Sequence, residues 1–216
     1  MLYAFTDESY TKDRYLQGAY VVADAQLREL DRVVDETLDF AERFGIAAGV
    51  ELRGYSIMNA RHGWEPLRGK FHAKSEIYKF FLSRIATVKG RIFVAEMISP
   101  PNGIIATENL PRHLQTQRLL FSQLNKYSER EGEFIEIVAD EITTSSFLKK
   151  EFEASGGDYP RIVNLEHLQS LSNPGIQVLD LLLYIYQRSH PGRHISSNSS
   201  RKALEMWEIV EDLLWR

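Results

Sequence analysis

The chain has 216 residues, with 30 Asp and Glu against 26 Lys and Arg, and it contains no cysteine. The lack of cysteine excludes disulfide scaffolds, thiolate metal sites and cysteine nucleophiles, which leaves oxygen and imidazole chemistry. A hydrophobic fraction of 44% is ordinary for a folded domain, and we expect residues 1–216 to form a single domain. A net charge of −4 does not by itself indicate a nucleic-acid partner.

The sequence predicts no membrane segment. No apolar run approaches the roughly 20 residues that span a bilayer. Asp7 and Glu8 also interrupt the stretch in which a signal peptide would be apolar. We therefore expect a cytoplasmic protein.

The first predicted elements form an antiparallel hairpin followed by a helix. Residues 2–6 carry bulky or apolar side chains on both faces, as in a central strand covered on both sides, and this strand ends on Asp7. A polar turn at 12–13 leads into a second strand over 15–22. Apolar residues at three- and four-residue steps predict an amphipathic helix over 26–44.

Helices and strands alternate in the rest of the chain. A strand over 134–139 ends on an acid, Asp140, as the first strand does. The other predicted elements are a helix over 75–88, a strand over 91–98, a break at 100–103, a helix over 109–130 and a strand over 161–166. This order predicts a mixed α/β fold with a central sheet.

The last predicted helix, which begins at Pro174 with Asn173 as its N-cap, carries the sharpest functional signal. It is almost entirely apolar, yet Gln177, Asp180, Tyr184 and Gln187 recur at steps of three, four and three and form one polar stripe. A buried, unpaired carboxylate costs several kcal/mol, so Asp180 requires a cation, good hydrogen bonds or a proton. A structural partner, Arg or Tyr, is one interpretation; a functional site is the other.

Three further acids are candidates for the same site. Asp7 and Asp140 each follow a predicted central strand, where α/β sheets place ligand-binding groups, although either acid could instead cap a turn. Glu51 lies in a glycine-rich stretch at 49–54 and, taken alone, is typical of a surface glutamate. Several carboxylates without a thiolate suit magnesium or manganese, and two such ions can support phosphodiester hydrolysis.

Basic residues gather in two stretches that flank these acids. The first stretch, 53–74, includes Arg53 and Lys70, and the second is 188–202. Such loops suit a phosphate backbone, or they serve only solubility. Trp64 and His72 are candidates for base stacking or proton transfer, with packing as the alternative.

The order of these motifs resembles a known family. The motifs are Asp-Glu-Ser after a strand at 5–9, Glu-Leu-Arg-Gly at 51–54 with a downstream Trp64, a strand ending in Asp at 138–140, and Ser172, Gln177 and Asp180 near and in the last helix. Together they resemble the bacterial domain-of-unknown-function family numbered 3800, which is placed among ribonuclease H-like folds.

The resemblance implies a site and a fold. Ribonuclease H-like enzymes bring acids from the first strand, a helix, a middle strand and the last helix around two metal ions, which implies those roles for Asp7, Glu51, Asp140 and Asp180. The chain departs from the family at Tyr10, where Gly is usual, and at Leu179, where a small residue is common. Tyr10 is expected to narrow access beside Asp7.

We therefore predict an α/β, ribonuclease H-like mixed central sheet flanked by helices, and a nuclease or phosphodiesterase that binds two magnesium or manganese ions. Nucleic acid is the expected substrate, and a homo-oligomer is allowed. The four acids are the expected metal ligands and catalytic residues. We expect Glu8, Glu141 and Gln177 to surround and orient these ligands. The expected substrate-binding residues are Arg53, Lys70 and His72.

Two alternatives remain open at the level of the sequence. The first alternative to a hydrolase is a non-catalytic module that keeps the fold and binds nucleic acid or protein. The second is a structural carboxylate network in which Asp180 pairs with Arg53.

Overall fold

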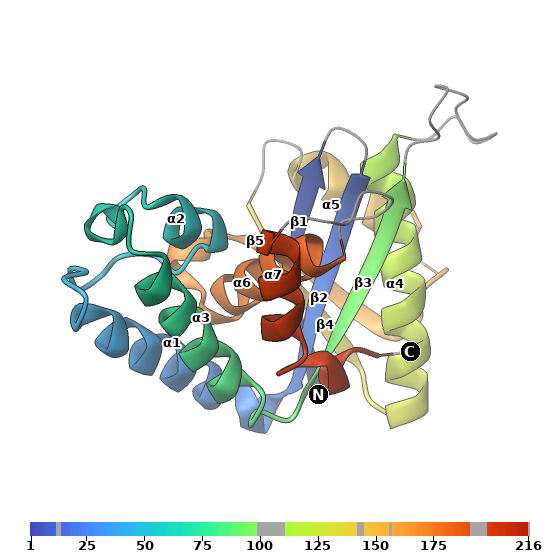
Figure 1. The fold of residues 1–216 in the computed structure, drawn as a ribbon. Helices are drawn as coiled ribbons and strands as arrows, with labels where there is room; N and C mark the ends of the chain where they lie inside the picture. The colour runs from blue at the N-terminus through green and yellow to red at the C-terminus, as the bar shows by residue number, and fades with distance from the viewer. Residues whose placement is uncertain (12–13, 99–110, 142–144, 156, 191–197, 216) are drawn as a thin grey trace.

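A five-stranded mixed sheet forms the centre of the computed structural model, which describes residues 1–11, 14–98, 111–141, 145–155, 157–190 and 198–215 (Figure 1). The strand order is β3-β2-β1-β4-β5. β1 pairs antiparallel with β2 and parallel with β4, β2 pairs antiparallel with β3, and β4 pairs parallel with β5. The strands are β1 (Leu2–Thr11), β2 (Arg14–Ala23), β3 (Gly90–Ile98), β4 (Ile135–Asp140) and β5 (Ile162–Leu168).

Helices cover both faces of this sheet, so the predicted α/β class with a mixed central sheet flanked by helices is confirmed. One face carries α6, backed by α1, α3 and α7, and the opposite face carries α4 (Figure 1). The helices are α1 (Leu27–Glu42), α2 (Gly54–Asn59), α3 (Phe71–Ile85), α4 (Arg112–Glu131), α5 (Ser145–Ala154), α6 (Pro174–Ser189) and α7 (Asn198–Trp207), with short 3-10 turns η1 (Asp24–Gln26), η2 (Glu65–Leu67), η3 (Ser170–Ser172) and η4 (Glu211–Leu213).

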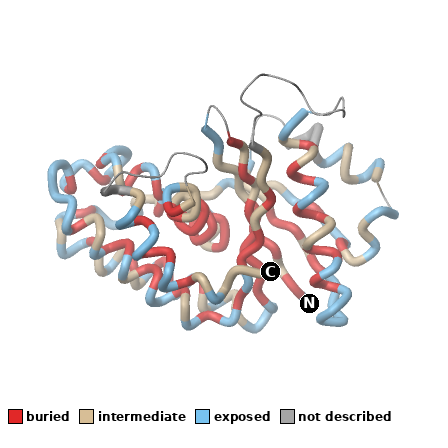
Figure 2. The backbone as a smooth tube through the Cα atoms, turned by 45° about the vertical axis from the view of Figure 1, so that its right-hand side comes forward, coloured by how far each residue is buried: buried red, intermediate tan, exposed pale blue. Residues whose placement is uncertain are grey.

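β1 is a central strand covered on both sides, as its sequence predicts. Tyr3 and Phe5 face the hydrophobic core beneath α6 and α1, whereas Leu2 and Ala4 face the second core beneath α4. The tube through β1 is accordingly mostly buried over Leu2–Thr6 and becomes exposed toward Thr11 (Figure 2). Alternating side chains point to opposite faces of a strand, so an apolar run without polar alternation is what a two-sided core requires.

β1 is longer than predicted and continues past Asp7 to Thr11. Its parallel pairing with β4 stops at the pair Thr6 and Ala139, but its antiparallel pairing with β2 continues and sets Asp7 opposite Gly18. The prediction that Asp7 follows the strand end is therefore wrong. Asp7 instead lies one residue beyond the point where β4 stops pairing, and Asp140 is the last residue of β4.

α6 begins as predicted and packs closely on β1. The Asn173 side chain accepts a hydrogen bond from the Ile176 backbone N–H at 3.1 Å, with Pro174 at the first helical position. A Cβ atom at Gly175 would lie 2.3 Å from the Phe5 ring, so glycine is required for this close approach. The first turn of α6 therefore rests directly against the central strand.

Three helices were not predicted. α2, α5 and α7 are each short, from six to ten residues, and short helices depend on tertiary packing more than on local periodicity. α6 is consequently not the last helix, because α7 follows it and packs against it. The predicted turn at 12–13 and break at 100–103 lie outside the described residues. No described helix is long and apolar enough to cross a bilayer.

Candidate carboxylate site

Asp7 and Asp140 occupy equivalent local positions on the neighbouring strands β1 and β4. The Asp7 carboxylate accepts the backbone N–H of Glu8 through Oδ1 at 2.7 Å. The Asp140 carboxylate accepts the backbone N–H of Glu141 in the same way, at 3.0 Å. Each acid is thus held by the residue that follows it, at the point where pairing between the two strands ends. Because β1 and β4 are adjacent parallel strands, both acids lie at the same end of the sheet, where the pairing of these strands stops.

Residues 51–54 reach the site as an irregular segment that docks on α6. The Gln177 side-chain oxygen accepts the backbone N–H of Leu52 at 3.0 Å, and the Asp180 Oδ1 atom accepts that of Gly54 at 2.6 Å. Gln177 and Asp180 lie about one turn apart on the same face of α6. They bind the N–H groups of Leu52 and Gly54, which lie two positions apart in the segment and so point in the same direction. The polar stripe of α6 therefore binds the backbone that carries Glu51.

Glu51 is held from two further sides. Its side-chain Oε1 accepts the Ser170 hydroxyl at 2.5 Å, and its backbone carbonyl accepts the indole N–H of Trp64 at 3.0 Å. Trp64 itself is fully buried, so the packing interpretation of this residue is confirmed. Glu51 precedes α2 rather than lying within a helix, which differs from the placement that the family resemblance implies.

Gly54 is required by the closeness of this docking. A Cβ atom at position 54 would lie 2.4 Å from the Tyr78 hydroxyl and 2.6 Å from the Tyr184 Cβ atom. No residue with a Cβ atom fits between Tyr78 and Tyr184 at this position without displacing them. The Gly54 N–H consequently reaches Asp180 directly.

Arg53 lies among three of the acids. Its Nε atom is 3.6 Å from Glu51 Oε1 and 3.9 Å from Asp180 Oδ2. Its charge also lowers the pKa of Asp140. The ion pair between Arg53 and Asp180 that one sequence alternative contains is therefore present.

The acids act on one another electrostatically. Burial raises the pKa of Asp7 well above its ordinary value, and the neighbouring Asp180 carboxylate raises it further. Burial likewise raises the pKa of Asp180 to about 6, against the opposing effects of the Gly54 N–H and Arg53. Burial raises the pKa of Asp140, while Arg53 and the backbone N–H groups of Glu141 and Ser170 lower it. Removing these groups from water disfavours their charged forms, and a nearby like charge adds to that effect.

The donor chemistry of the four acids fits a hard divalent cation. Each carboxylate has one oxygen anchored by a protein hydrogen bond: Asp7 by Glu8, Glu51 by Ser170, Asp140 by Glu141 and Asp180 by Gly54. A carboxylate has two oxygens, so an anchored one retains acceptor capacity, and oxygen donors from separate elements suit magnesium or manganese. Among the described residues, however, no three His, Asp or Glu side chains are arranged as ligands of one metal ion.

A cleft of about 420 Å³ opens beside two of these acids, between β1, α6 and the segment that contains α2. We call it the Asp7–Asp180 cleft. Asp7 and Asp180 line it together with Arg53, and aromatic and polar side chains form the rest of its wall. These are Glu8, Ser9, Tyr10, Tyr55, Ser56, His62, Leu183, Tyr184 and Gln187.

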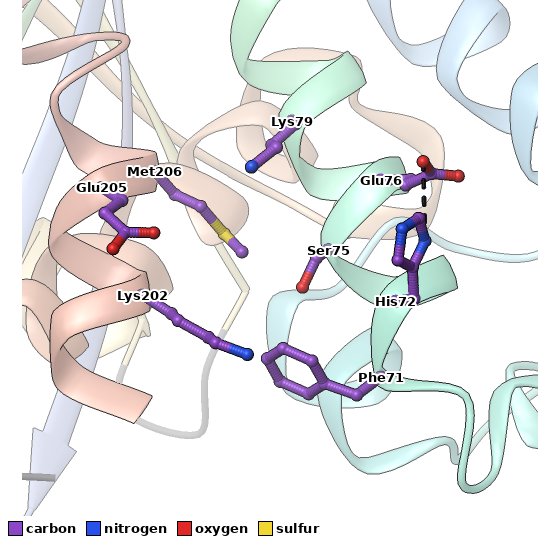
Figure 3. A pocket seen from close by; sticks show the side chains of 8 residues that line it. All are labelled: Phe71, His72, Ser75, Glu76, Lys79, Lys202, Glu205 and Met206. Atoms are coloured by element: carbon purple, nitrogen blue, oxygen red, sulfur yellow. Dashed lines mark ion pairs between the residues drawn. The ribbon is translucent and has the colours of Figure 1, made fainter. Parts of the chain in front are cut away.

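The other predicted residues lie within the site, on the exposed surface or in a second groove. Gln177 orients the 51–54 backbone, Glu8 accepts the Tyr15 hydroxyl, and Glu141 is exposed. Lys70 is exposed at the start of α3. His72 lines a second groove, between α3 and α7, where it pairs with Glu76 at 3.5 Å (Figure 3). That groove also receives Lys202, which brings the two basic stretches of the sequence together.

Sequence reasoning missed several residues of the site. Ser170, in η3, links two acids, because its hydroxyl binds Glu51 and its backbone N–H lowers the pKa of Asp140. Tyr55 and His62 line the cleft from the α2 segment. No periodicity marks these residues, since Tyr55 and Ser170 lie in short helical turns and His62 lies outside the helices and strands.

The fold and site define an α/β protein with an anchored carboxylate cluster beside a cleft. No protein-family description matches the chain, and no curated protein matches its sequence. The resemblance to the family numbered 3800 therefore rests on the motifs quoted above.

Proposed function

We propose that this protein is a divalent-metal-dependent nuclease or phosphodiesterase. One observation carries the proposal: four carboxylates from four separate segments are each anchored by one oxygen, and burial together with neighbouring carboxylates raises the pKa of Asp7 and Asp180. Such repulsion is costly unless the charges serve a ligand, because each buried carboxylate is desolvated. The family resemblance points to the same four residues.

Different residues of the chain would bind the metal ions, orient the metal ligands and contact the substrate. Asp7, Glu51, Asp140 and Asp180 would hold magnesium or manganese, and two such ions supply an activated water and stabilise the leaving oxygen in phosphodiester hydrolysis. Glu8, Glu141 and Ser170 act on these acids through hydrogen bonds or neighbouring charge, which orients them. Arg53, whose side chain is 46% exposed, would contact a phosphate oxygen.

Cleavage assays test this function directly. Labelled single-stranded RNA, single-stranded DNA and an RNA–DNA hybrid are incubated with Mn²⁺ or Mg²⁺ and either the wild type or Asp7→Asn. Asp158→Asn, which changes an exposed acid away from the cleft, is the matched control. We expect cleavage by the wild type and the control only. Equal substrate loss with wild type and Asp7→Asn would contradict the assignment.

A second candidate is favoured by the position of Arg53. Its guanidinium forms ion pairs with Glu51 and Asp180, as a purely structural carboxylate network would require. The second candidate is accordingly a non-catalytic module that binds nucleic acid or protein. The possible homo-oligomer and the nucleic-acid partner remain predictions under either candidate.

Arg53→Gln separates the two candidates. Loss of the cation leaves the acids unpaired and lowers the free energy of unfolding in EDTA under both candidates. If the acids bind metal, Mn²⁺ restores the lost stability, because the ion replaces the missing positive charge. If the network is structural, Mn²⁺ has no effect on the variant. Arg68→Gln, an exposed arginine outside the cleft, is the control.

A further inference from the structure

Two exposed tyrosines form part of the wall of the Asp7–Asp180 cleft. Tyr10, on β1, is 70% exposed, and Tyr55, on α2, is 50% exposed. The two come from segments far apart in the sequence, and both line the cleft that contains Asp7 and Asp180. Exposed aromatic residues are ordinary when scattered singly, whereas these two offer flat ring faces to the same polar cleft.

Each ring has a defined neighbour within the protein. The Tyr10 ring lies nearly parallel to that of Tyr15, with centroids 6.4 Å apart and an interplanar angle of 10°. The Tyr15 hydroxyl is in turn held by Glu8. The guanidinium carbon of Arg61 lies 6.0 Å from the centroid of the Tyr55 ring. Both rings are thus supported by a neighbour while remaining largely exposed. Binding of a ligand that stacks on them would therefore cost little conformational entropy of these side chains.

Cationic groups accompany the two rings. Arg53 lines the same cleft, and Arg61 accompanies Tyr55. Aromatic rings interspersed with cations are the combination that proteins use for single-stranded nucleic acid, because bases stack on the rings and the cations follow the phosphates.

We propose that the Asp7–Asp180 cleft selects unpaired nucleotides, with Tyr10 and Tyr55 as stacking platforms for bases. This inference rests on the proposed function, since it takes the cleft as the substrate site. In a duplex the base faces are covered by neighbouring base pairs, so they cannot stack on protein rings. Tyr10 and Tyr55 are then specificity-determining residues that discriminate single strands from duplexes.

Binding measurements test the inference without requiring cleavage. Fluorescence anisotropy of a labelled single-stranded oligonucleotide and of its duplex is measured with the wild-type chain in EDTA, and again in Mn²⁺ with Asp7→Asn. We expect Tyr10→Ala and Tyr55→Ala each to weaken single-strand binding about tenfold and to leave duplex binding unchanged. Tyr10→Phe and Tyr55→Phe, which keep the ring, are expected to bind like the parent protein.

Phe134→Ala is the matched control. Phe134 is 48% exposed and has the guanidinium carbon of Arg161 at 5.1 Å from its ring centroid, which resembles Tyr55 with Arg61. It lies beside the first residue of β1, since its carbonyl accepts the Leu2 N–H at 2.8 Å, and it does not line the cleft. Its loss is expected to leave single-strand binding unchanged.

The outcomes are distinct. Tyrosine-dependent single-strand binding without any metal-dependent cleavage would support the inference and count against the hydrolase. Cleavage or binding of a duplex as readily as of a single strand, unaffected by either alanine substitution, would overturn the inference and leave the hydrolase standing. Absence of single-strand binding both by the wild type in EDTA and by Asp7→Asn in Mn²⁺ would also overturn it.

Discussion

Asp180 on α6 accepts the backbone N–H of Gly54 at 2.6 Å, across 126 positions of sequence. One turn earlier on the same helix, Gln177 accepts the backbone N–H of Leu52. Two side chains of α6 therefore set the position of the segment that brings Glu51 and Arg53 to the acids. Asp180 is both a member of the carboxylate site and one of the anchors that assemble it.

Gly54→Ala tests the closeness of this docking. The added methyl group would collide with the Tyr78 hydroxyl and the Tyr184 Cβ atom, so we expect a loss of roughly 1–3 kcal/mol in the free energy of unfolding, measured with urea. Gly157→Ala is the control, because a Cβ atom there meets nothing within 4 Å, and its effect should stay within about 0.5 kcal/mol. Equal stability of the two variants would contradict the close approach of α3 and α6 at Gly54.

Gln177→Ala tests the second anchor. The substitution removes the acceptor for the Leu52 N–H and the amide that donates to the carbonyls of Ser170 and Leu171. We expect a loss of roughly 2–3 kcal/mol, since buried backbone groups are left without partners. Hydrogen exchange should become faster at the Leu52 amide in particular. Gln169→Ala, at an exposed position, should leave that exchange rate unchanged.

Metal-free stability should fall as pH rises. Burial raises the folded-state pKa of Asp7, Asp140 and Asp180, so the fold binds their protons more tightly than the unfolded chain does. Their contribution is present at low pH and is lost as pH rises through the folded pKa, which for Asp180 is about 6. Between pH 5 and pH 8 in EDTA we expect Asp180 alone to cost about 1.4 kcal/mol, because roughly one pKa unit of its titration falls in that range.

Comparison with Asp180→Asn isolates that effect. The variant should lose less stability than the wild type over the same pH range, because asparagine carries no titrating charge. His167, whose pKa is lowered by burial, acts in the opposite direction, but it is common to both proteins. Parallel pH profiles for the two proteins would show that Asp180 titrates normally.

Divalent metal should stabilise the fold through the acids. At a Mn²⁺ concentration about 100 times the dissociation constant, a single site contributes about 2.7 kcal/mol, and the melting temperature rises accordingly. Asp140→Asn should reduce the rise, whereas Asp24→Asn, at an exposed position before α1, should keep it. A wild-type melting temperature that does not respond to Mn²⁺ or Mg²⁺ would make the non-catalytic module the better interpretation.

Local pattern was sufficient for the central elements. The two-sided apolar run in β1, the alternation of strands and helices, and the Asn173 and Pro174 start of α6 follow from side-chain periodicity and capping, and the structure has all of them. These features depend on neighbours within one element. The short helices α2, α5 and α7 were missed because their stability comes from packing rather than from periodicity.

The acids that stand out are already evident in the amino-acid sequence, because Asp7 and Asp140 each follow an apolar run and Asp180 belongs to a polar stripe. The assembly of the site is evident only in three dimensions: Glu51 arrives on a segment docked against α6, Arg53 lies among the acids, Ser170 links Glu51 and Asp140, and Tyr10 and Tyr55 share one cleft. The difference is one of range. Hydrogen bonds and ion pairs between irregular segments leave no period in the sequence, so their partners are set by how α2, η3 and α6 pack at the edge of the sheet.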